Sequence, residues 1–335
     1  MARICILGAG SWGTALAVLL VGNGHTVTLW SHRAKEVLAM QRTSANESKL
    51  PGVVLPREIR YSSQLKEAVK NQDLLVFAVP SKATRETAKK IKDLIPEDQK
   101  IVSVSKGIEE GTLYSQTQIL EDVLKGALTA ALSGPSHAEE VVRRIPTLVV
   151  AASKSHDLAL LTQELFMNAN FRVYISPDLL GVEIGGSLKN VIALAAGMSD
   201  GLGYGDNTKA ALITRGIKEI TRLAVAMGAK EDTLAGLSGI GDLIVTCQSM
   251  HSRNRMAGYY IGQGDSAQEA MDKVKMVVEG VYSARAARAL GQRYGVDLPI
   301  IEQVNRVLFE QMDVRKAVLE LMGREKKAEL DHCSW

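Results

Sequence analysis

The feature that most constrains the fold is a run without charged side chains, from Ile4 to Gly24, inside the segment RICILGAGSWGTALAVLLVGNGH. Its length is close to the roughly 20 residues that a helix needs to cross a bilayer, and the run could also be a signal peptide. Five glycines and Asn23 fit a membrane segment poorly. Three of the glycines form Gly8-x-Gly10-x-x-Gly13 between a strand-like and a helix-like run, which is typical of a dinucleotide-binding turn.

Each glycine of this turn has its own physical task. Gly8 permits the tight turn, Gly10 lets the backbone approach a pyrophosphate, and Gly13 lets the helix pack closely on the strand. Backbone N–H groups at the start of the helix then face the phosphates, which the positive end of the helix dipole also favours. The segment therefore predicts the floor of a cofactor site in preference to a membrane span.

The rest of the chain divides into two parts of different character. Short apolar runs predict buried strands at 3–7, 26–30, 74–79, 101–104, 128–132, 147–151 and 171–175, with amphipathic segments such as 64–70 and 82–93 between them. This alternation predicts a parallel sheet covered by helices on both faces. After Pro177 only helical periodicity remains, in runs at 208–227, 253–263, 283–294, 299–309 and 313–322. Because 335 residues suit two domains, we expect an α/β Rossmann-type domain over 1–180 and an all-helical domain over 181–335.

Charge and cysteine content exclude several classes of function. Forty basic and 37 acidic residues leave a formal charge of +3, too even for general affinity for DNA or an anionic membrane. The few aromatic residues argue against a single-strand nucleic-acid binder. Cys5, Cys247 and Cys333 are odd in number and far apart, so we expect no disulfide framework and no metal site, and the usage suits a reducing cytosol.

The end of the second predicted strand bears on the choice of cofactor. An NAD site usually has an acid there for the ribose hydroxyls, whereas a 2′-phosphate favours arginine. This chain has Trp30-Ser31-His32-Arg33 and no acid before Glu36. We therefore predict a preference for NADPH, with Arg33 at the 2′-phosphate, helped by Ser31 or His32, and with NADH still possible. The alternative is that Arg33 is a solvated loop residue.

Polar residues follow three strands of the first domain. They are Pro80-Ser81, Ser105-Lys106-Gly107, and the loop from Ser133 to Ala138. Ligands of open α/β sheets bind beyond the carboxyl ends of the strands, so Lys106 is a candidate to reach into that crevice. The alternative is an ordinary exposed loop lysine.

A second candidate lysine belongs to the helical part. Lys189 and Asn190 precede VIALAAGM, a run that is apolar almost all round, and a buried ammonium group is costly without partners. Gly185, Gly186 and Ala193 lie one helical turn from Lys189, which predicts room for a ligand above it. Desolvation would lower the pKa of Lys189 toward the range useful for proton transfer. The alternative is a lysine whose ammonium group reaches solvent at a helix edge.

Two further clusters and one acid occur in the same half. Asp242 belongs to the glycine-rich turn GIGD, and the segment HSRNR begins a helix with Ser252 as a plausible N-cap. A serine, the guanidinium of Arg253 and helix-start N–H groups suit a monophosphate, although a capped, solvated helix start is the alternative. Glu279 could contact the cofactor or cap a helix.

Taken together, the motifs GAGSWGTALA, VSVSKGIE, LSGPSHAEEV, GSLKNVIALAAGMSDGL, GLSGIGDLIVTC and SRNR resemble the bacterial NAD(P)-dependent glycerol-3-phosphate dehydrogenases from end to end. The resemblance implies reversible reduction of dihydroxyacetone phosphate to sn-glycerol 3-phosphate, which supplies glycerophospholipid synthesis. It also implies a helical domain like the C-terminal domain of 6-phosphogluconate dehydrogenase, and a cytoplasmic homodimer.

The resemblance also implies roles for individual residues. Lys189 is implied as the proton donor in reduction, supported by Asn190, with Lys106 and Asp242 beside it. Substrate-binding residues implied by the resemblance are Lys106, Gly134, Ser136, Lys189, Asp242, Ser252, Arg253 and Asn254. Cofactor-binding residues are Gly8, Gly10, Ser11, Trp12, Gly13, His32, Arg33, Lys106, Ala138, Arg253, Val277 and Glu279, of which Val277 rests on the resemblance alone. His137 departs from the aromatic residue often found after Ser136 in this family, and we expect little consequence.

Two rival functions share parts of this pattern. Another two-domain dehydrogenase, acting on a β-hydroxyacid or ketoacid, would have the same first domain and similar lysine–asparagine chemistry. The SRNR cluster and the monophosphate it implies favour the triose phosphate. A non-catalytic NADP-sensing module is the other rival, but such a sensor has no need of a buried ammonium group.

Overall fold

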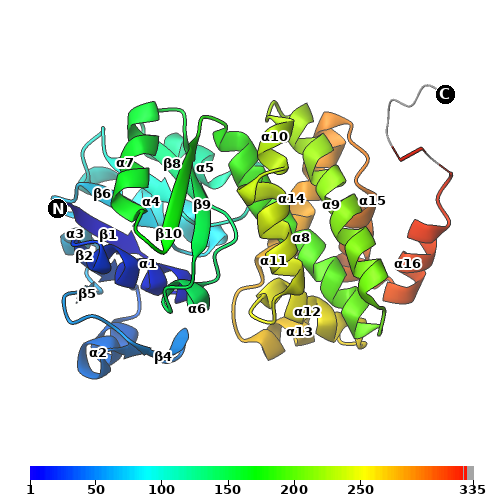
Figure 1. Ribbon diagram of the computed structural model, residues 1–335, viewed down its shortest axis with the longest axis horizontal. Helices are drawn as coiled ribbons and strands as arrows, with labels where there is room; N and C mark the ends of the chain where they lie inside the picture. Colours follow the sequence, from blue (N-terminus) through cyan, green and yellow to red (C-terminus); the bar gives the residue numbers. More distant parts are fainter. Residues whose placement is uncertain (327, 330–335) are drawn as a thin grey trace.

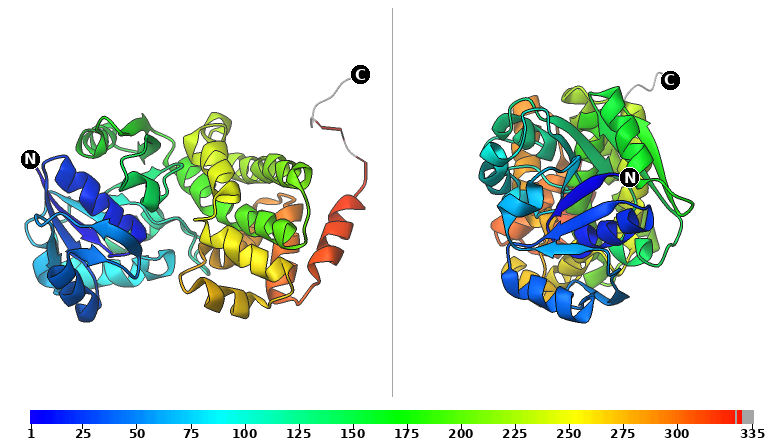
Figure 2. Two further views of the ribbon diagram at one scale, coloured as in Figure 1. Left: turned by 60° about the horizontal axis from the view of Figure 1, so that its bottom comes forward. Right: turned by 90° about the vertical axis from the view of Figure 1, so that its left-hand side faces the viewer.

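The computed structural model describes residues 1–326, 328 and 329. It has two parts side by side, a sheet with its helices and a bundle of helices (Figure 1). The turned view at the left of Figure 2 shows the same separation. The amino-terminal part is a Rossmann-like sheet domain and the carboxy-terminal part is all-helical, so the predicted fold class is confirmed.

The main sheet has eight strands in the order β10-β9-β8-β7-β6-β1-β2-β5. Their bounds are β1 Arg3–Leu7, β2 Thr26–Trp30, β5 Arg60–Ser62, β6 Leu74–Phe77, β7 Lys100–Ser103, β8 Leu128–Ser133, β9 Thr147–Ser153 and β10 Phe171–Ser176. All seven predicted strands are present, with ends displaced by two residues at most. A separate hairpin of β3 (Ala45–Asn46) and β4 (Leu50–Val54), as well as β5, was not predicted.

The expectation of a parallel sheet is wrong at one pair of strands. β8 and β9 are antiparallel, whereas β9 and β10 are parallel to each other. The segment between β8 and β9 contains only the one-turn helix α6 (Ala138–Val141). A parallel crossover normally needs a full helix to return the chain to the starting edge of the sheet. The chain therefore re-enters the sheet from the edge at which β8 ended.

Helices cover both faces of the sheet, and their bounds are α1 Ser11–Gly22, α2 Ala34–Thr43, α3 Leu65–Val69, α4 Thr84–Ile91, α5 Gln116–Val123 and α7 His156–Phe166. Alternate residues of β1 point to opposite faces: Ile4 and Ile6 pack with α1 and α7, whereas Cys5 and Leu7 pack with α3, α4 and α5. This two-sided burial explains why the opening run carries no charge. The helical portion of the run is α1, whose 12 residues are fewer than the roughly 20 that a membrane span needs.

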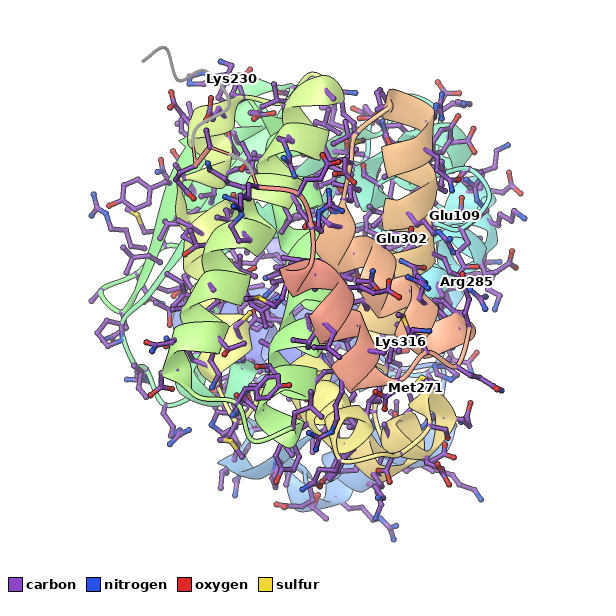
Figure 3. The ribbon with its side chains drawn as sticks, turned by 90° about the vertical axis from the view of Figure 1, so that its right-hand side faces the viewer. Glu109, Lys230, Met271, Arg285, Glu302 and Lys316 are labelled. Carbon is purple, nitrogen blue, oxygen red and sulfur yellow. The ribbon has the colours of Figure 1, made fainter. Side chains whose placement is uncertain are left out.

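The carboxy-terminal part is built around one long buried helix. Its helices are α8 Leu179–Gly201, α9 Asp206–Ala226, α10 Glu231–Leu234, α11 Asp242–Gln248, α12 Arg253–Gly262, α13 Ala267–Val274, α14 Glu279–Tyr294, α15 Pro299–Phe309 and α16 Val314–Met322. Within the described residues, α8 alone is long and apolar enough to cross a membrane, but 89% of its most apolar stretch is buried inside the protein. The proposed division at residues 180 and 181 lies in the first turn of α8. Figure 3 shows the outer face of this part, where Glu302 and Lys316 are labelled on α15 and α16.

Helices α8 and α12 touch through their backbones. A Cβ atom on Gly197 would lie 2.0 Å from the carbonyl oxygen of Arg255, and one on Gly258 would lie 2.1 Å from that of Leu194. Larger side chains would force the helices apart, because neither position has space for a single methyl group. The glycines therefore fix the distance between the helix that bears Lys189 and the helix that bears Arg253.

Candidate active site

The glycine turn after β1 has the geometry that its sequence predicts. Gly8 has φ +120°, and a Cβ atom there would lie 2.6 Å from the carbonyl oxygen of Ala78. A Cβ atom on Gly13 would lie 2.0 Å from the carbonyl oxygen of Gly8, whereas one on Gly10 would meet no atom within 4 Å. The turn is thus closed where strand and helix meet and open beside Gly10. An open backbone surface at the start of α1 fits a pyrophosphate.

The unpredicted hairpin is tied to this turn. Asn46 Nδ2 donates to the carbonyl oxygen of Ala9 at 3.0 Å and to Thr14 Oγ1 at 2.8 Å. Ser11 Oγ donates to the carbonyl oxygen of Lys49 at 2.5 Å. Trp12 and Ala138 pack in one small apolar cluster with Leu50 and Ala15. Trp12, Ala138 and the glycine turn therefore lie together, with the hairpin alongside.

The predicted site residues follow one edge of the sheet. Strands β2, β1, β6, β7 and β8 are consecutive neighbours and mutually parallel, so their carboxyl ends lie on the same side. In that order they are followed by His32 and Arg33, by the glycine turn, by Ser81, by Lys106, and by Gly134 with Ser136. At about 4.8 Å between strands, these loops extend over about 19 Å. An elongated ligand lying across the edge could reach all of them.

Lys189, Lys106 and Asp242 meet where this edge faces the helical part. The Asp242 carboxylate accepts from Lys189 Nζ at 2.5 Å through Oδ1 and from Lys106 Nζ at 2.6 Å through Oδ2. The side chains of Asp242 and Lys189 are 1% and 8% exposed. Lys189 is therefore not a lysine that reaches solvent at a helix edge. Asp242 links both lysines across the boundary between sheet and helices.

The environment of Lys189 favours its neutral form. Burial lowers the pKa of Lys189 to about 8, with the charge of Lys106 adding to the effect and the carboxylate of Asp242 opposing it. Thr246 Oγ1, which the sequence reasoning missed, accepts from Lys189 Nζ at 2.6 Å. Thr246 follows Asp242 by four residues on α11, so helical periodicity would have placed both side chains on one face.

The small residues near Lys189 serve a different purpose from the one predicted. A Cβ atom on Gly185 would lie 2.6 Å from the carbonyl oxygen of Ser238, and one on Gly186 would lie 2.7 Å from Ser133 Oγ. The expectation that they leave room for a ligand is wrong, because neighbouring protein segments fill that space. Their small size instead allows α8 to approach the loop after β8.

A second group of residues joins α8, α12 and α14. Asn254 Nδ2 donates to Asn190 Oδ1 at 2.9 Å, and Asn254 Oδ1 accepts from the backbone N–H of Gly280 at 2.9 Å. Ser252 is the N-cap of α12, as predicted, and its Oγ accepts from the backbone N–H of Arg255 at 3.2 Å. Asn254 therefore holds the start of α12 against two other helices.

Arg253 is the first residue of α12 and is exposed. Within the described residues, its guanidinium group makes no hydrogen bond or ion pair. His251, just before the cap, faces His137 with ring centroids 5.9 Å apart. Burial, followed by the charge of Lys189, lowers the pKa of His137, and its Nε2 has no hydrogen-bond partner in the described part of the chain. The guanidinium of Arg253 thus lies at the start of α12, beside the helix-start N–H groups and next in sequence to Asn254, which contacts α8.

Glu279 connects α14 to the loop after β6. Its carboxylate accepts from the backbone N–H of Ser81 at 3.1 Å and from Ser81 Oγ. Burial raises the pKa of Glu279, although the bonds from Ser81 oppose this effect. Val277 is partly buried just before α14.

In the loop after β8, Gly134 has φ +145°. Its carbonyl oxygen accepts from Lys106 Nζ at 3.1 Å and from Ser136 Oγ at 3.0 Å.

One acid lies where the sequence predicts none. The carboxylate of Glu36, on α2, accepts from Ser31 Oγ at 2.9 Å and from Arg33 Nη1 at 3.0 Å. His32 lies between these residues in sequence and is exposed, with its ring 6.4 Å from that of Trp30. The end of β2 therefore carries both a cation and an anion.

Comparison with known proteins agrees with this arrangement. Residues 3–159 match the family model described as the NAD-dependent glycerol-3-phosphate dehydrogenase N-terminus, and residues 178–319 match the model of its C-terminus. Proteins named glycerol-3-phosphate dehydrogenase (NAD(P)+) from Fusobacterium nucleatum and Agathobacter rectalis are 56% and 57% identical, with full coverage of both chains.

Solved structures show the same relationship. A crystal structure of glycerol-3-phosphate dehydrogenase from Coxiella burnetii has a TM-score of 0.93 and 39% identity, covering 96% of this chain and 99% of that one. A ketopantoate reductase from Ralstonia eutropha, at 19% identity and a TM-score of 0.60, shares the fold alone. The matching models and the end-to-end identity show that this chain belongs to the NAD-dependent glycerol-3-phosphate dehydrogenase family.

Proposed function

We propose that this protein reduces dihydroxyacetone phosphate to sn-glycerol 3-phosphate, reversibly and with NADPH as the preferred nucleotide, and so supplies glycerophospholipid synthesis. The observation that carries the proposal is the buried Lys189, held by a carboxylate that Lys106 shares. A buried ammonium group with a pKa of about 8 suits proton exchange near neutral pH. Membership of the family supplies the substrate.

Lys189 is the proposed proton donor. When bound, the nicotinamide nucleotide supplies the hydride. The Lys189 ammonium group polarises the substrate carbonyl and gives its proton to the oxygen as negative charge develops there. Asp242 and Thr246 hold the ammonium nitrogen in place. Lys106 adds positive potential at the same oxygen. In the reverse direction neutral Lys189 accepts the proton.

Arg253 is the proposed anchor for the substrate phosphate. Its guanidinium has no bonded partner among the described residues, and it lies on the first residue of α12, next to the Ser252 cap. Gly134 and Ser136 approach the substrate from the loop after β8. Asn254 already uses its amide on Asn190 and Gly280, so we propose that it acts mainly by positioning α12 against α8. Fixing the substrate carbonyl beside the nucleotide through its phosphate can contribute about 7–11 kcal/mol to lowering the barrier.

The proposed nucleotide site extends along the carboxyl edge of the sheet. The glycine turn takes the pyrophosphate, as the open space beside Gly10 allows. Ser11, Trp12 and Ala138 line the same region, and Arg33 with His32 takes the 2′-phosphate. Residues proposed for the nicotinamide side are Lys106, Arg253, Val277 and Glu279.

A direct assay tests the proposal. Purified protein is mixed with NADPH and dihydroxyacetone phosphate, and the loss of NADPH absorbance is followed. A panel of ketoacids is tested in the same way, and 6-phosphogluconate is tested with NADP+ through the gain in NADPH absorbance. We expect turnover with the triose phosphate and a fall in kcat of about 100-fold or more in Lys189→Ala. Turnover confined to a ketoacid would support the rival dehydrogenase, and nucleotide binding without any turnover would support the sensing module.

We also propose a cytoplasmic homodimer, as the family resemblance implies. Leu319 and Met322 on α16 are 71% and 81% exposed, and they offer apolar surface for a second copy. Light scattering after size-exclusion chromatography measures the mass directly. A mass of one chain at micromolar concentration would contradict this part of the proposal.

A further inference from the structure

The acid at the end of β2 is Glu36, which is separated from the strand in sequence by a loop and the first residues of α2. Glu36 is the third residue of α2, whose N-cap is Arg33, and it lies six residues after the strand ends at Trp30. Its carboxylate nevertheless returns to the strand end, where it accepts from Ser31 Oγ at 2.9 Å. Ser31 is buried, at 4% exposed. Glu36 thus brings a carboxylate to the residue that follows β2, the end of the strand where NAD sites keep an acid for the ribose hydroxyls.

Glu36 and Arg33 differ in how firmly they are held. The Glu36 side chain is 26% exposed, and it bonds with Arg33 and with the buried Ser31. The Arg33 side chain is 59% exposed, and among the residues that the structure describes its one side-chain bond is to Glu36 at 3.0 Å. Arg33 can leave this ion pair at little cost, because exposed pairs of this kind contribute little. Glu36 would then remain in place with a free carboxylate oxygen.

These two side chains have opposite effects on the two nucleotides. A ribose 2′-hydroxyl can donate to the Glu36 carboxylate, whereas a 2′-phosphate at the same place meets a like charge. Arg33 favours the phosphate but is neutralised by Glu36 in the absence of nucleotide. The site therefore combines an acceptor suited to NADH with a cation suited to NADPH.

We propose that Glu36 is a specificity-determining residue that limits the preference for NADPH and sustains the use of NADH. The inference rests on the proposed function only in placing a nicotinamide nucleotide on the carboxyl edge of the sheet. Its direction is definite. Removing the charge of Glu36 should strengthen binding of a 2′-phosphate and weaken binding of a ribose that lacks one.

Binding of nucleotide fragments to the full chain tests the inference without catalysis. Adenosine 2′,5′-bisphosphate and 5′-AMP are titrated by calorimetry into the wild type, Glu36→Gln and Arg33→Gln. We expect Glu36→Gln to bind the bisphosphate about tenfold more tightly, a change of about 1.4 kcal/mol, and 5′-AMP several-fold more weakly. The gain should shrink at high salt, because the groups are partly exposed. Arg33→Gln should lose affinity for the bisphosphate only.

Glu86→Gln is a matched control. Glu86 is also a first-turn acid with an ion pair three residues on, to Lys89 at 3.2 Å, but it belongs to α4. It should leave both affinities unchanged. A thermal melt of each variant checks that it is folded.

The outcomes separate the inference from the proposed function. If the ratio of the two affinities stays within twofold of the wild type in Glu36→Gln, or moves toward 5′-AMP, the inference is wrong even though triose phosphate reduction continues. If the ratio moves as expected but no variant and no wild type reduces dihydroxyacetone phosphate, the inference stands and the proposed function is wrong. If the enzyme is active, the ratio of kcat/KM for NADPH to kcat/KM for NADH should be higher in Glu36→Gln than in the wild type.

Discussion

Replacing Asp242 with Asn removes the negative charge that two lysines share while keeping the shape of the side chain. In the wild type, Asp242 lies 2.5 Å from Lys189 Nζ and 2.6 Å from Lys106 Nζ, and its side chain is 1% exposed. The variant leaves two ammonium groups close together without a counter-charge. Burial and the charge of Lys106 already lower the pKa of Lys189, so without Asp242 it should lose its proton more readily.

The size of the effect follows from the geometry. An opposite charge within hydrogen-bonding distance shifts a pKa by about 1–3 units. With a loss of about two units, the pKa of Lys189 falls from about 8 to about 6. At pH 7.5 the charged fraction of Lys189 then drops from about 75% to about 3%, which is a loss of about 25-fold in the form that can donate a proton.

The assay is the pH dependence of kcat/KM for dihydroxyacetone phosphate under saturating NADPH, which reports the protonation of the enzyme before the substrate binds. In the wild type the alkaline limb should have its midpoint near pH 8, since reduction needs charged Lys189. In Asp242→Asn that midpoint should move to about pH 6, and activity should recover as the pH is lowered toward it. Recovery at low pH distinguishes a change in proton affinity from a collapsed site.

Asp200→Asn is the control for this experiment. Asp200 also joins two cations, Lys209 at 2.8 Å and Arg255 at 2.8 Å, and it lies on the same helix as Lys189. Eleven residues of helix separate it from Lys189 by about 16 Å. The Asp200→Asn substitution should therefore leave the alkaline midpoint of the pH profile unchanged. If Asp242→Asn also leaves that midpoint at pH 8, or raises it, the charge of Asp242 does not set the protonation of Lys189.

Three further changes test other parts of the molecule. Arg253→Ala should raise KM for the triose phosphate about tenfold or more, with a smaller effect on kcat, because a charged hydrogen bond contributes about 1.5–3 kcal/mol; an unchanged KM in initial-rate kinetics would contradict the phosphate anchor. Gly258→Ala should lower the thermal midpoint through a cost of about 1–3 kcal/mol or more, since its Cβ would lie 2.1 Å from the carbonyl oxygen of Leu194; an unaltered melt would show that the helix contact can yield. Burial raises the pKa of Glu219, which accepts from the backbone N–H of Ile300, to about 7. Its folded pKa lies above its unfolded value, so the wild type should lose about 3 kcal/mol relative to Glu219→Gln between about pH 4.5 and 7, and a difference in unfolding free energy that does not vary with pH would contradict this reasoning.

The parts of the fold with strong local patterns were predictable. The seven apolar runs correctly predicted β-strands, because strands that are buried on both faces of a sheet have nearly continuous apolar sequences. The glycine turn correctly predicted the junction between a strand and a helix. The longer helices of the second part were also predicted, and α15 matches its predicted range of 299–309. The short helices α10, α11 and α13 were missed, since four to eight residues carry little periodicity.

What the sequence could not reveal depends on contacts between distant residues. The direction of β9 depends on whether the segment after β8 crosses back to the opposite edge of the sheet, and amino-acid composition does not determine this. Asn46 reaches the glycine turn across 37 residues of sequence, and Asn254 joins Asn190 across 64. Glu36 is near Ser31 in sequence, but only the path of the loop brings its carboxylate back to the strand. The roles of Asn46, Asn254 and Glu36 therefore depend on contacts that local sequence patterns do not predict.

The bond between Lys106 and Asp242 joins the two domains through the same carboxylate that holds Lys189. Any hinge motion that separates the domains withdraws Lys106, lessens the repulsion at the Lys189 ammonium group and raises its pKa. Thermodynamic reciprocity then requires that loss of the proton favours the closed arrangement. On the proposed mechanism, loss of the Lys189 proton during reduction would therefore favour the closed arrangement, and uptake of a proton from solvent would favour the open one. Product release and restoration of the acid for the next turnover would then be coupled through the one carboxylate of Asp242.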